Sequence, residues 1–568
     1  MLRSPLDRFT AGVTTAFAVA VLCAFPLYID RFSNLGLTKF TGDFSVFLLF
    51  GFLIGACRLV GARAPRERFL SARRDVGLWA LWAFVLVSIA ATLTSLSPVS
   101  SLWGLGGYYG GLMMVLYTAV GYLCLRSYAD FRDLDLLFLG VGASSSVVAV
   151  LYMLNIFNID LIGAYADTAV VERAQFFSTL GQKNFNGGFF AVSLPIIFYA
   201  FLSAKGLRRS LIFAVPAFFG ALALAVVDAE GLTLGIGVAA MVLVWHKDFN
   251  TRHLRRIALI GAAFFGWARW MYWMRRTVYT QGGTSIIAAF GRRELAWPCL
   301  AGCLLLWVVL LVLPRQLARR RGGEVQELPL WKPGRVLVVL VLAGAALLTL
   351  LANCWPGFPS LGRLDDLLIF NDDWGTYRGT AWRITWESWL SQPFWRKLLG
   401  VGPGMMHTAV LNWAGEAATA RMKTFYAAHN EYLEQLLTTG LLGLAAWVTF
   451  AAAHLRRGFR HWNRPAVAPV MLALCSYLAQ AAVSIRVSMI FPLVMLLFGL
   501  LAALTAPEPA SLPQEAEAPR QGRHRRKGKK QADPPAPYWP HALRVAIGGV
   551  VGMAAGGALA PVLFWFLF

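Results

Sequence analysis

Charged residues are scarce in this chain: they make up 14% of its 568 residues, while hydrophobic residues make up 58%. Soluble globular proteins carry roughly a quarter charged residues. Apolar runs of about 18 to 25 residues recur along the sequence, long enough to cross the ~30 Å hydrocarbon core of a bilayer as helices. A backbone in lipid must satisfy its own hydrogen bonds, which favours helices as the spans. The sequence therefore predicts an all-α polytopic membrane protein in contact with a lipid bilayer.

Patterns typical of metal sites are lacking as well. The seven cysteines form no CxxC pair and no Cys/His spacing that suggests a metal centre. Almost all lie inside apolar runs, where small core residues are the simpler interpretation. We expect no metal and no cofactor. The first apolar run lacks an obvious small-residue cleavage site, so we expect a retained helix rather than a removed signal peptide.

Lysine and arginine are nearly missing from the loops at 96–106 and 157–185, while basic clusters occupy the alternate connections. This alternation follows the positive-inside rule, which predicts a cytoplasmic N-terminus and places the segment 353–430 outside. The net charge of +23 is thus distributed over loops that flank the membrane. We therefore expect no nucleic-acid partner.

We expect about 14 to 15 transmembrane helices from this pattern of apolar runs. The spans are expected at 10–29, 43–60, 77–95, 107–125, 135–156, 187–204, 211–227, 231–246, 257–274, 295–313, 337–353, 430–454, 467–485, 487–505 and 543–567. The run at 257–274 is a poor span because it contains Arg269.

The chain divides into a polytopic membrane domain at 1–505, a linker at 507–540 and an additional C-terminal helix at 543–567. The linker is rich in Pro, Ala and Glu and contains the basic octamer RHRRKGKK. Its composition predicts a disordered cytoplasmic segment. The octamer either binds anionic lipid headgroups or fixes the orientation of the last helix.

The segment 353–430 is a long polar insert between two apolar runs. A chain that only spans lipid needs no such concentration of Arg, Asp, Trp and His, so we expect the catalytic loop here. A helix near 376–391 would place three tryptophans, of which Trp382 is the first, on one face, with Arg378 one turn earlier. Such a helix either anchors in the headgroup region or directs Arg378 at lipid phosphate. Arg383 and Glu387 would form an i,i+4 ion pair.

The insert ends in AHNEYLEQLL, where Asn430 is suited to cap the next helix and leaves His429 just outside its first turn. Glu431 and Glu434 suit the positive end of that helix. His429 is either a solvated interfacial residue or a base, because histidine is the side chain most easily poised near neutral pH. The preceding GVGPGMMH is interpreted as a turn rather than a phosphate loop.

Other polar residues on the predicted outer side join this set. Arg173, Lys183, Asn184 and Asn186 lie at the mouth of the sixth span, and Glu230 lies in a tight turn before the eighth. Ionisable groups at the membrane face are costly unless they are paired or functional. Cations, carboxylates and one histidine suit an anionic, lipid-attached substrate that approaches from outside.

Motifs in residues 180–505 together resemble those of the O-antigen ligase and polymerase family of bacterial surface-polysaccharide enzymes. They comprise an RxxxW segment (Arg378, Trp382), a Pro-then-GxGPG turn (Pro393, Gly400, Gly402, Gly404), the HNxxLxxLxxxGLxGL signature (His429, Asn430, Leu433, Leu436, Gly440, Gly443) and the Asn-rich loop GQKNFNGG.

The resemblance implies a metal-independent membrane glycosyltransferase of GT-C-like fold in the bacterial plasma membrane, with an extracytoplasmic active site. Its donor would be a glycan on undecaprenyl pyrophosphate, and its acceptor a lipid, a protein or a growing polysaccharide. His429 would be the base or acceptor-orienting residue and Arg378 would contact pyrophosphate. The expected substrate-binding residues are Arg383, Lys183, Asn184, Arg173, Asn430 and Trp382.

One position departs from the family pattern. Many relatives carry an arginine after the turn that precedes the eighth span, where this chain has Glu230. A cation for the donor phosphate is therefore missing or is supplied by Arg275, Arg276 or Arg383.

Ligase and polymerase activities stay equally open, because the acceptor leaves no trace in the sequence. A lipid-linked oligosaccharide flippase or polysaccharide exporter would share the many spans, but it would need charges throughout a central cavity. A peptidoglycan polymerase would use the same carrier, although its signatures are not seen. A structural scaffold would leave the His–Asn and Arg–Trp motifs unexplained.

Overall fold

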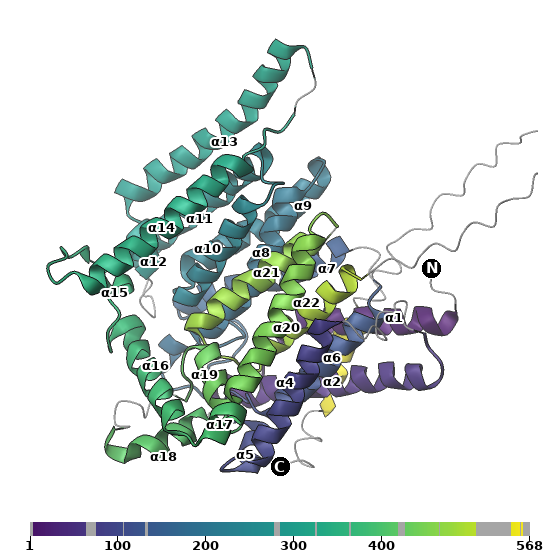
Figure 1. Cartoon of the computed structure of the whole chain (residues 1–568). Coiled ribbons are helices and arrows are strands. Elements are labelled where there is room, and N and C mark those ends of the chain that lie inside the picture. The colour runs from purple at the N-terminus through teal and green to yellow at the C-terminus, as the bar shows by residue number, and fades with distance from the viewer. Residues whose placement is uncertain are drawn as a thin grey trace, which may run out of the picture.

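The computed structural model describes residues 4–63, 75–105, 107–130, 134–277, 285–323, 326–362, 365–418, 426–464, 466–506, 547–556 and 558–559. The predicted linker at 507–540 and both ends of the last expected span lie outside these residues. In the described part every regular element is a helix, and extended pairing is limited to two isolated bridges. Figure 1 shows the long helices side by side in one bundle, with α16 to α19 gathered at one end, here called the insert end.

Eight of the described helices are long and apolar enough to cross a membrane. They contain α1 (Pro5–Val19), α2 (Leu35–Leu59), α4 (Val76–Leu93), α7 (Leu134–Ile156), α8 (Lys183–Ser203), α9 (Leu207–Val226), α13 (Arg293–Arg321) and α14 (Trp331–Cys354). The prediction of a multi-pass α-helical membrane protein is confirmed.

The other expected spans coincide with helices that are shorter or more polar. These are α6 (Leu112–Tyr128), α10 (Glu230–Trp245), α11 (Thr251–Thr277), α20 (Gly440–Arg460), α21 (Val467–Gln480), α22 (Phe491–Leu504) and a helix at 547–556. The predicted count of about 14 to 15 spans therefore exceeds the number of described helices that reach the length and apolarity of a full crossing.

Further helices complete the connections: α5 (Pro98–Trp103), α12 (Ser285–Phe290), α15 (Asp365–Leu368), α16 (Trp374–Ser391), α17 (Phe394–Leu399), α18 (Met406–Ala418) and α19 (Glu431–Thr438). The expected span at 430–454 is wrong as a single helix, because the chain breaks between α19 and α20. Gly440 adopts φ +67° at the break, and a Cβ there would lie 2.2 Å from the carbonyl oxygen of Leu398. Close approach of two backbones thus requires glycine and separates the two helices.

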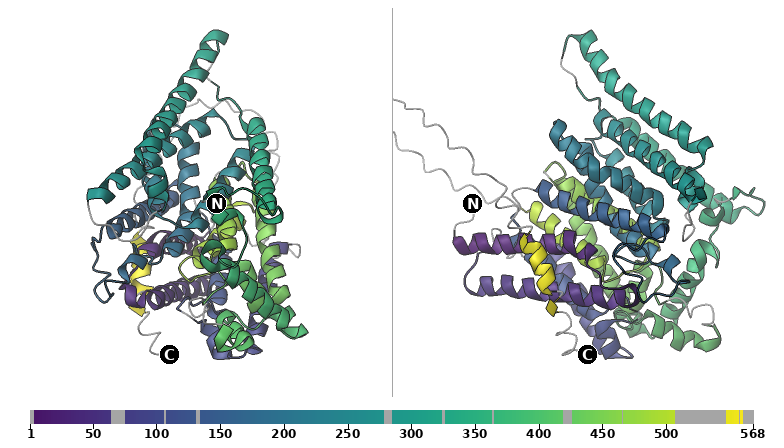
Figure 2. Two further views of the ribbon diagram at one scale, coloured as in Figure 1. Left: turned by 90° about the vertical axis from the view of Figure 1, so that its left-hand side faces the viewer. Right: turned by 180° about the vertical axis from the view of Figure 1, so that it is seen from behind.

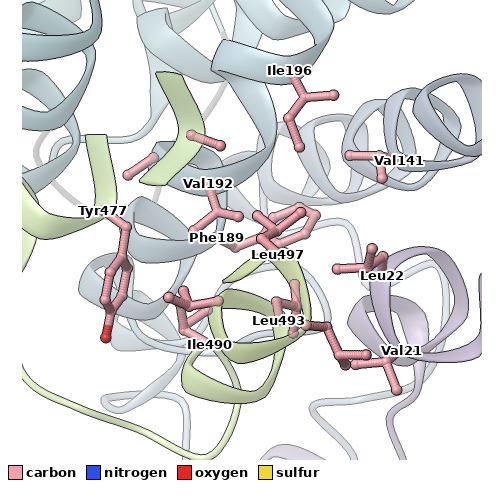
Figure 3. Close-up of a cluster of buried hydrophobic side chains, with 14 of the residues drawn as sticks. Val21, Leu22, Val141, Phe189, Val192, Ile196, Tyr477, Ile490, Leu493 and Leu497 are labelled. Atoms are coloured by element: carbon pink, nitrogen blue, oxygen red, sulfur yellow. The ribbon is translucent and has the colours of Figure 1, made fainter. Parts of the chain in front are cut away.

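The core lies around α8, of whose apolar stretch 89% is buried. Figure 3 shows Phe189, Val192 and Ile196 of α8 among side chains of α7, α21, α22 and the first span. In contrast, 6% of the apolar stretch of α14 and 11% of that of α13 are buried, and α13 lies at the edge of the bundle in both views of Figure 2. In a bilayer such apolar, uncovered helices face lipid.

A buried ion network joins three helices at the end of the bundle opposite the insert end. Asp75 accepts a hydrogen bond from Leu78 N at the start of α4 (3.3 Å), pairs with Arg126 of α6, and contacts Arg457 of α20 at 2.9 Å. The side chains of Asp75 and Arg126 are 2% and 1% exposed. Tyr122 receives a bond from Arg126 and contacts His454, which extends the network along α6 and α20.

Removing the carboxylate from this network should destabilise the fold. Breaking a buried pair costs about 3 to 5 kcal/mol, so we expect Asp75→Ala to lower the unfolding temperature of the detergent-solubilised protein clearly. Asp167→Ala is the matched control, because Asp167 pairs with Arg31 in a half-exposed setting, where a pair contributes about 0 to 1 kcal/mol. Equal unfolding temperatures for the two variants would show that the network does not hold the helices together.

Candidate active site at the insert end

The first turns of α8, α10 and α19 meet at the insert end. A Cβ on Gly187 of α8 would lie 2.7 Å from Cβ of Ala229, just before α10, and one on Gly231 would lie 3.0 Å from the Gln480 side chain. Tyr432 of α19 donates to the carbonyl oxygen of Leu478 in α21 (2.6 Å). Helix α16 packs against α19, as Figure 1 shows. Segments far apart in the sequence therefore form one neighbourhood.

Arg378 and Glu230 are paired in this neighbourhood. Arg378 Nη1 donates to Glu230 Oε2 at 2.8 Å and to the carbonyl oxygen of Gly375 at 3.1 Å. The arginine side chain is 8% exposed, whereas the glutamate side chain is 47% exposed. Among the described residues, Arg378 Nε is buried and has no hydrogen-bond acceptor. The guanidinium is thus enclosed by protein, whereas its carboxylate partner is open to solvent.

His429 belongs to the same cluster. The pKa of His429 is lowered to about 4: burial is the largest cause, the positive charge of Arg378 adds to it, and the negative charge of Glu230 opposes both effects. The imidazole is therefore neutral near pH 7 and has a nitrogen lone pair that can accept a proton. The backbone of His429 is left-handed, with φ +52°. Left-handed backbone at a non-glycine residue is often found at functional sites.

The three residues before Arg378 are not helical, although they lie within α16. Gly375, Thr376 and Tyr377 are all left-handed, with φ between 59° and 67°. Thr380 closes the turn by donating its N–H and its hydroxyl to the carbonyl oxygen of Asp372 (2.9 and 2.8 Å). The regular part of α16 therefore begins at Arg378, inside the predicted helix near 376–391.

Hydrogen bonds of the two residues next to His429 in the chain hold its backbone in place. The Asn430 side chain accepts from the N–H groups of Tyr432 (3.1 Å) and Leu433 (3.0 Å), so the predicted N-cap is confirmed. On the other side of the histidine, Ala428 N donates to Glu434 Oε2 at 3.2 Å. Because the Asn430 oxygen already accepts two bonds, its position in the site is that of a helix cap.

A second ion pair joins Glu431 of α19 to Arg486 and was not predicted from the sequence. Glu431 Oε1 accepts from Arg486 Nη2 and Nε (2.6 and 2.9 Å), and its Oε2 accepts from the hydroxyl of Tyr477 (2.7 Å). The Arg486 guanidinium also lies over the rings of Trp447 and Phe491. A cavity of about 20 Å³ adjoins this pair and is lined also by Glu434 and Gln435. The single signal in the sequence was an arginine between two apolar runs.

The GxGPG segment is the turn that its sequence predicted. Gly400, Gly402 and Gly404 all have positive φ. The N–H groups of Val401 and Gly402 donate to the carbonyl oxygens of Leu437 (3.1 Å) and Thr438 (2.9 Å), at the end of α19. These donors are therefore engaged with protein, and the glycines serve close packing against α19.

The remaining predicted residues lie in different settings. Arg383 forms a two-pronged pair with Asp372 (2.9 Å for both bonds) and the predicted contact with Glu387 at 3.4 Å. Trp382 packs against Trp374, with 5.0 Å between ring centroids. Lys183 is exposed and Asn184 is half-buried at the start of α8. Arg173 lies over the ring of Tyr165 and bonds to Thr168 O, both in its own loop.

Asn186, also noted in the sequence, is fully buried and holds a turn. It accepts from the Ser178 hydroxyl (2.6 Å) and donates to the carbonyl oxygen of Gly181 (2.9 Å). Of the three arginines named as substitutes for a cation at position 230, Arg383 is committed to Asp372. Arg275 is exposed at the end of α11, and the side chain of Arg276 lies outside the described residues.

In the part of the chain that the structure describes, no group of three or more His, Cys, Asp or Glu side chains could hold a metal ion. No protein-family model and no curated protein matches this chain. The sequence motifs and the geometry of the site are therefore the grounds on which a function can be proposed.

The lowered pKa of His429 has a consequence for stability. An imidazole that is harder to protonate in the folded than in the unfolded protein contributes stability above pH 6.5, and this contribution is lost as the pH falls from 6.5 to about 4. We expect the unfolding temperature of the wild type to fall more between pH 7 and pH 4.5 than that of His429→Gln. Thermal unfolding of both proteins in the same detergent measures the difference. Identical losses would mean that His429 is not buried as described.

Proposed function

We propose that this protein is a membrane glycosyltransferase of the O-antigen ligase and polymerase type. It transfers a glycan from an undecaprenyl-pyrophosphate carrier to an acceptor hydroxyl at the outer face of the bacterial plasma membrane. The observation that carries the proposal is that α16, which carries Arg378, packs against α19, which directly follows His429 and Asn430, so that the charge of Arg378 acts on the imidazole. Arg378 and His429 both come from the motifs that resemble this family, and no local sequence pattern requires them to be neighbours.

The reaction needs a base and a cationic partner for the leaving group. The acceptor oxygen forms a bond to the anomeric carbon while the bond from that carbon to the carrier phosphate breaks. The hydroxyl proton passes to His429, and the pyrophosphate leaves with the bonding electrons. Arg378 stabilises the negative charge that grows on the leaving group, and a guanidinium suits phosphate oxygens because it offers a planar fork of N–H donors.

Buried donors next to this cluster support an anionic ligand. Among the described residues, Arg378 Nε and Trp382 Nε1 are buried N–H groups without an acceptor, and they lie one helical turn apart on α16. Most buried donors in folded proteins are satisfied, so two such groups require an explanation. Phosphate oxygens that enter beside Arg378 would supply acceptors. The first turns of α8 and α10 add the positive ends of two helices to the same region.

The low pKa of the resting histidine fits this reaction. A base with a pKa of about 4 binds a proton weakly. A bound pyrophosphate places negative charge beside the imidazole, and nearby negative charge raises the pKa of a histidine. His429 therefore becomes a stronger base when the donor is bound. It then accepts the proton of the acceptor hydroxyl more readily, whereas in the empty site it stays unprotonated in contact with solvent.

Complementation of cells that lack this protein tests the function. Wild type should restore surface glycan, whereas His429→Ala at equal expression should not, and lipid-linked precursor should accumulate. Transport without transfer would instead move lipid-linked substrate across vesicles without forming new glycosidic bonds. Full rescue by His429→Ala would remove the proposed base and favour a flippase or exporter.

Arginine variants test the second role in the purified protein. Arg378→Ala should reduce glycosyl transfer roughly 100-fold, the usual effect of losing one charge-stabilising donor. Arg378→Lys should recover part of the rate, because it restores the charge without the fork. Arg31→Ala is the control, since this exposed arginine pairs with Asp167 on another loop. Unchanged transfer by a folded Arg378→Ala protein would exclude contact with the leaving group.

A further inference from the structure

We infer that Glu230 is a resident counter-ion which a ligand phosphate displaces from Arg378, so that ligand binding at this site is an exchange of anions. This inference rests on the proposed function, because it takes Arg378 as the phosphate-binding residue. It assigns to Glu230 a specificity-determining role that its position in the sequence did not suggest.

The geometry makes Glu230 the accessible half of the pair. The Arg378 side chain is 8% exposed and the Glu230 side chain is 47% exposed, with 2.8 Å between Nη1 and Oε2. The carboxylate is therefore the part of the pair that is open to solvent. The negative charge of Glu230 is more accessible to a phosphate from solvent than the enclosed positive charge of Arg378.

The pair is also incomplete. Arg378 donates to Glu230 through Nη1 alone, and in the described structure its Nε has no acceptor. Arg383, on the same helix, shows the complete arrangement, with Nε and Nη2 each 2.9 Å from one oxygen of Asp372. A two-pronged pair holds its carboxylate by two charge-assisted bonds, whereas Glu230 is held by one. The arginine thus holds Glu230 by fewer hydrogen bonds than Arg383 uses to hold Asp372.

A displaced Glu230 keeps a favourable position. It is the first residue of α10, where the positive end of the helix stabilises a carboxylate. Because the side chain is half exposed, it can turn into solvent while the backbone of α10 stays in place. The exchange therefore requires one side chain to move, and no helix has to shift.

The exchange favours ligands with more than one phosphate. At rest Arg378 and Glu230 cancel each other, so a single phosphate replaces one anion with another and gains little charge attraction. A diphosphate brings additional charge and additional acceptor oxygens for the N–H groups beside Arg378. An anion must therefore displace Glu230 in order to bind Arg378. This requirement selects a diphosphate over a monophosphate.

Anion binding to the purified protein in nanodiscs tests this inference. The probes are inorganic pyrophosphate and inorganic phosphate, titrated by calorimetry into wild type, Glu230→Gln and Arg378→Ala. Glu230→Gln keeps the shape of the side chain and removes its charge, so pyrophosphate should bind about tenfold more tightly, a change of ~1.4 kcal/mol. Phosphate should gain more than pyrophosphate, so that the preference for the diphosphate narrows.

The controls separate this role from general electrostatics and from misfolding. Asp167→Asn removes a carboxylate that is 48% exposed and also paired with an arginine, and it should leave both affinities unchanged. Glu230→Asp keeps the charge on a shorter side chain, so it should tighten binding less than Glu230→Gln. An equal gain in anion affinity in Asp167→Asn would show that the gain comes from the net charge of the protein surface. That result would overturn the inference.

The outcomes also distinguish this inference from the proposed function. Binding that depends on Arg378 but is unchanged or weaker in Glu230→Gln would overturn the counter-ion role and leave the donor site intact. Pyrophosphate binding that is equal in wild type and Arg378→Ala would contradict both. Absence of binding in all variants would likewise overturn the exchange, since the exchange requires an anion to bind.

Discussion

The site depends on one short helix that cannot be stable by itself. Helix α19 has eight residues, and isolated helices shorter than about 12 to 15 residues are marginal in water. Both of its ends and its buried face are bonded to other parts of the chain. Asn430 caps its start, the GxGPG turn donates to its last carbonyl groups, and Glu431 is tied to Arg486. His429 is positioned because this helix is positioned.

Arginine residues at the opposite end of the bundle bond to the ends of other helices. Helices that finish there expose carbonyl groups without partners in the helix, and arginine side chains can bond to them. Arg256 donates to Leu202 O and Ala204 O at the end of α8. Arg464 does so at the end of α22, and Arg335 donates to Trp245 O at the end of α10. The charge pattern that predicts orientation thus also stabilises helix ends.

Local features of the site could be predicted from the sequence. The cap at Asn430, the turn at GVGPG, the helix that carries Arg378 and the Arg383–Glu387 contact all depend on neighbours within a few residues. Periodicity and capping preferences report on such short distances. They detect regular helices best, so they did not foresee the three left-handed residues before Arg378 or the break between α19 and α20.

The ion pairs between residues that are distant in the sequence, in the site and elsewhere in the bundle, could not be predicted from the sequence. Glu230 and Arg378 lie 148 positions apart, Asp75 and Arg457 lie 382 apart, and Glu431 and Arg486 lie 55 apart. Each partner taken alone is consistent with a solvated charge near a membrane surface. Hydropathy fixes which segments cross the bilayer, but many arrangements of the same helices satisfy it. The contact between particular ends of α10 and α16 follows from the packing of the whole bundle.

Position 230 shows how such a contact changes the interpretation of a single residue. In the sequence, Glu230 stands where many members of the family that the motifs resemble carry an arginine. This difference suggests a lost phosphate contact. In the structure the glutamate neutralises the buried Arg378, while burial keeps His429 neutral. The charges of Arg378 and Glu230 therefore balance in the resting site. Arg378 does not present an unneutralised positive charge that would attract small anions. Under the proposed function, a diphosphate upsets that balance in the productive direction: it draws Arg378 away from Glu230 and raises the pKa of His429. The same binding event then makes Arg378 available to the diphosphate and makes His429 a stronger base.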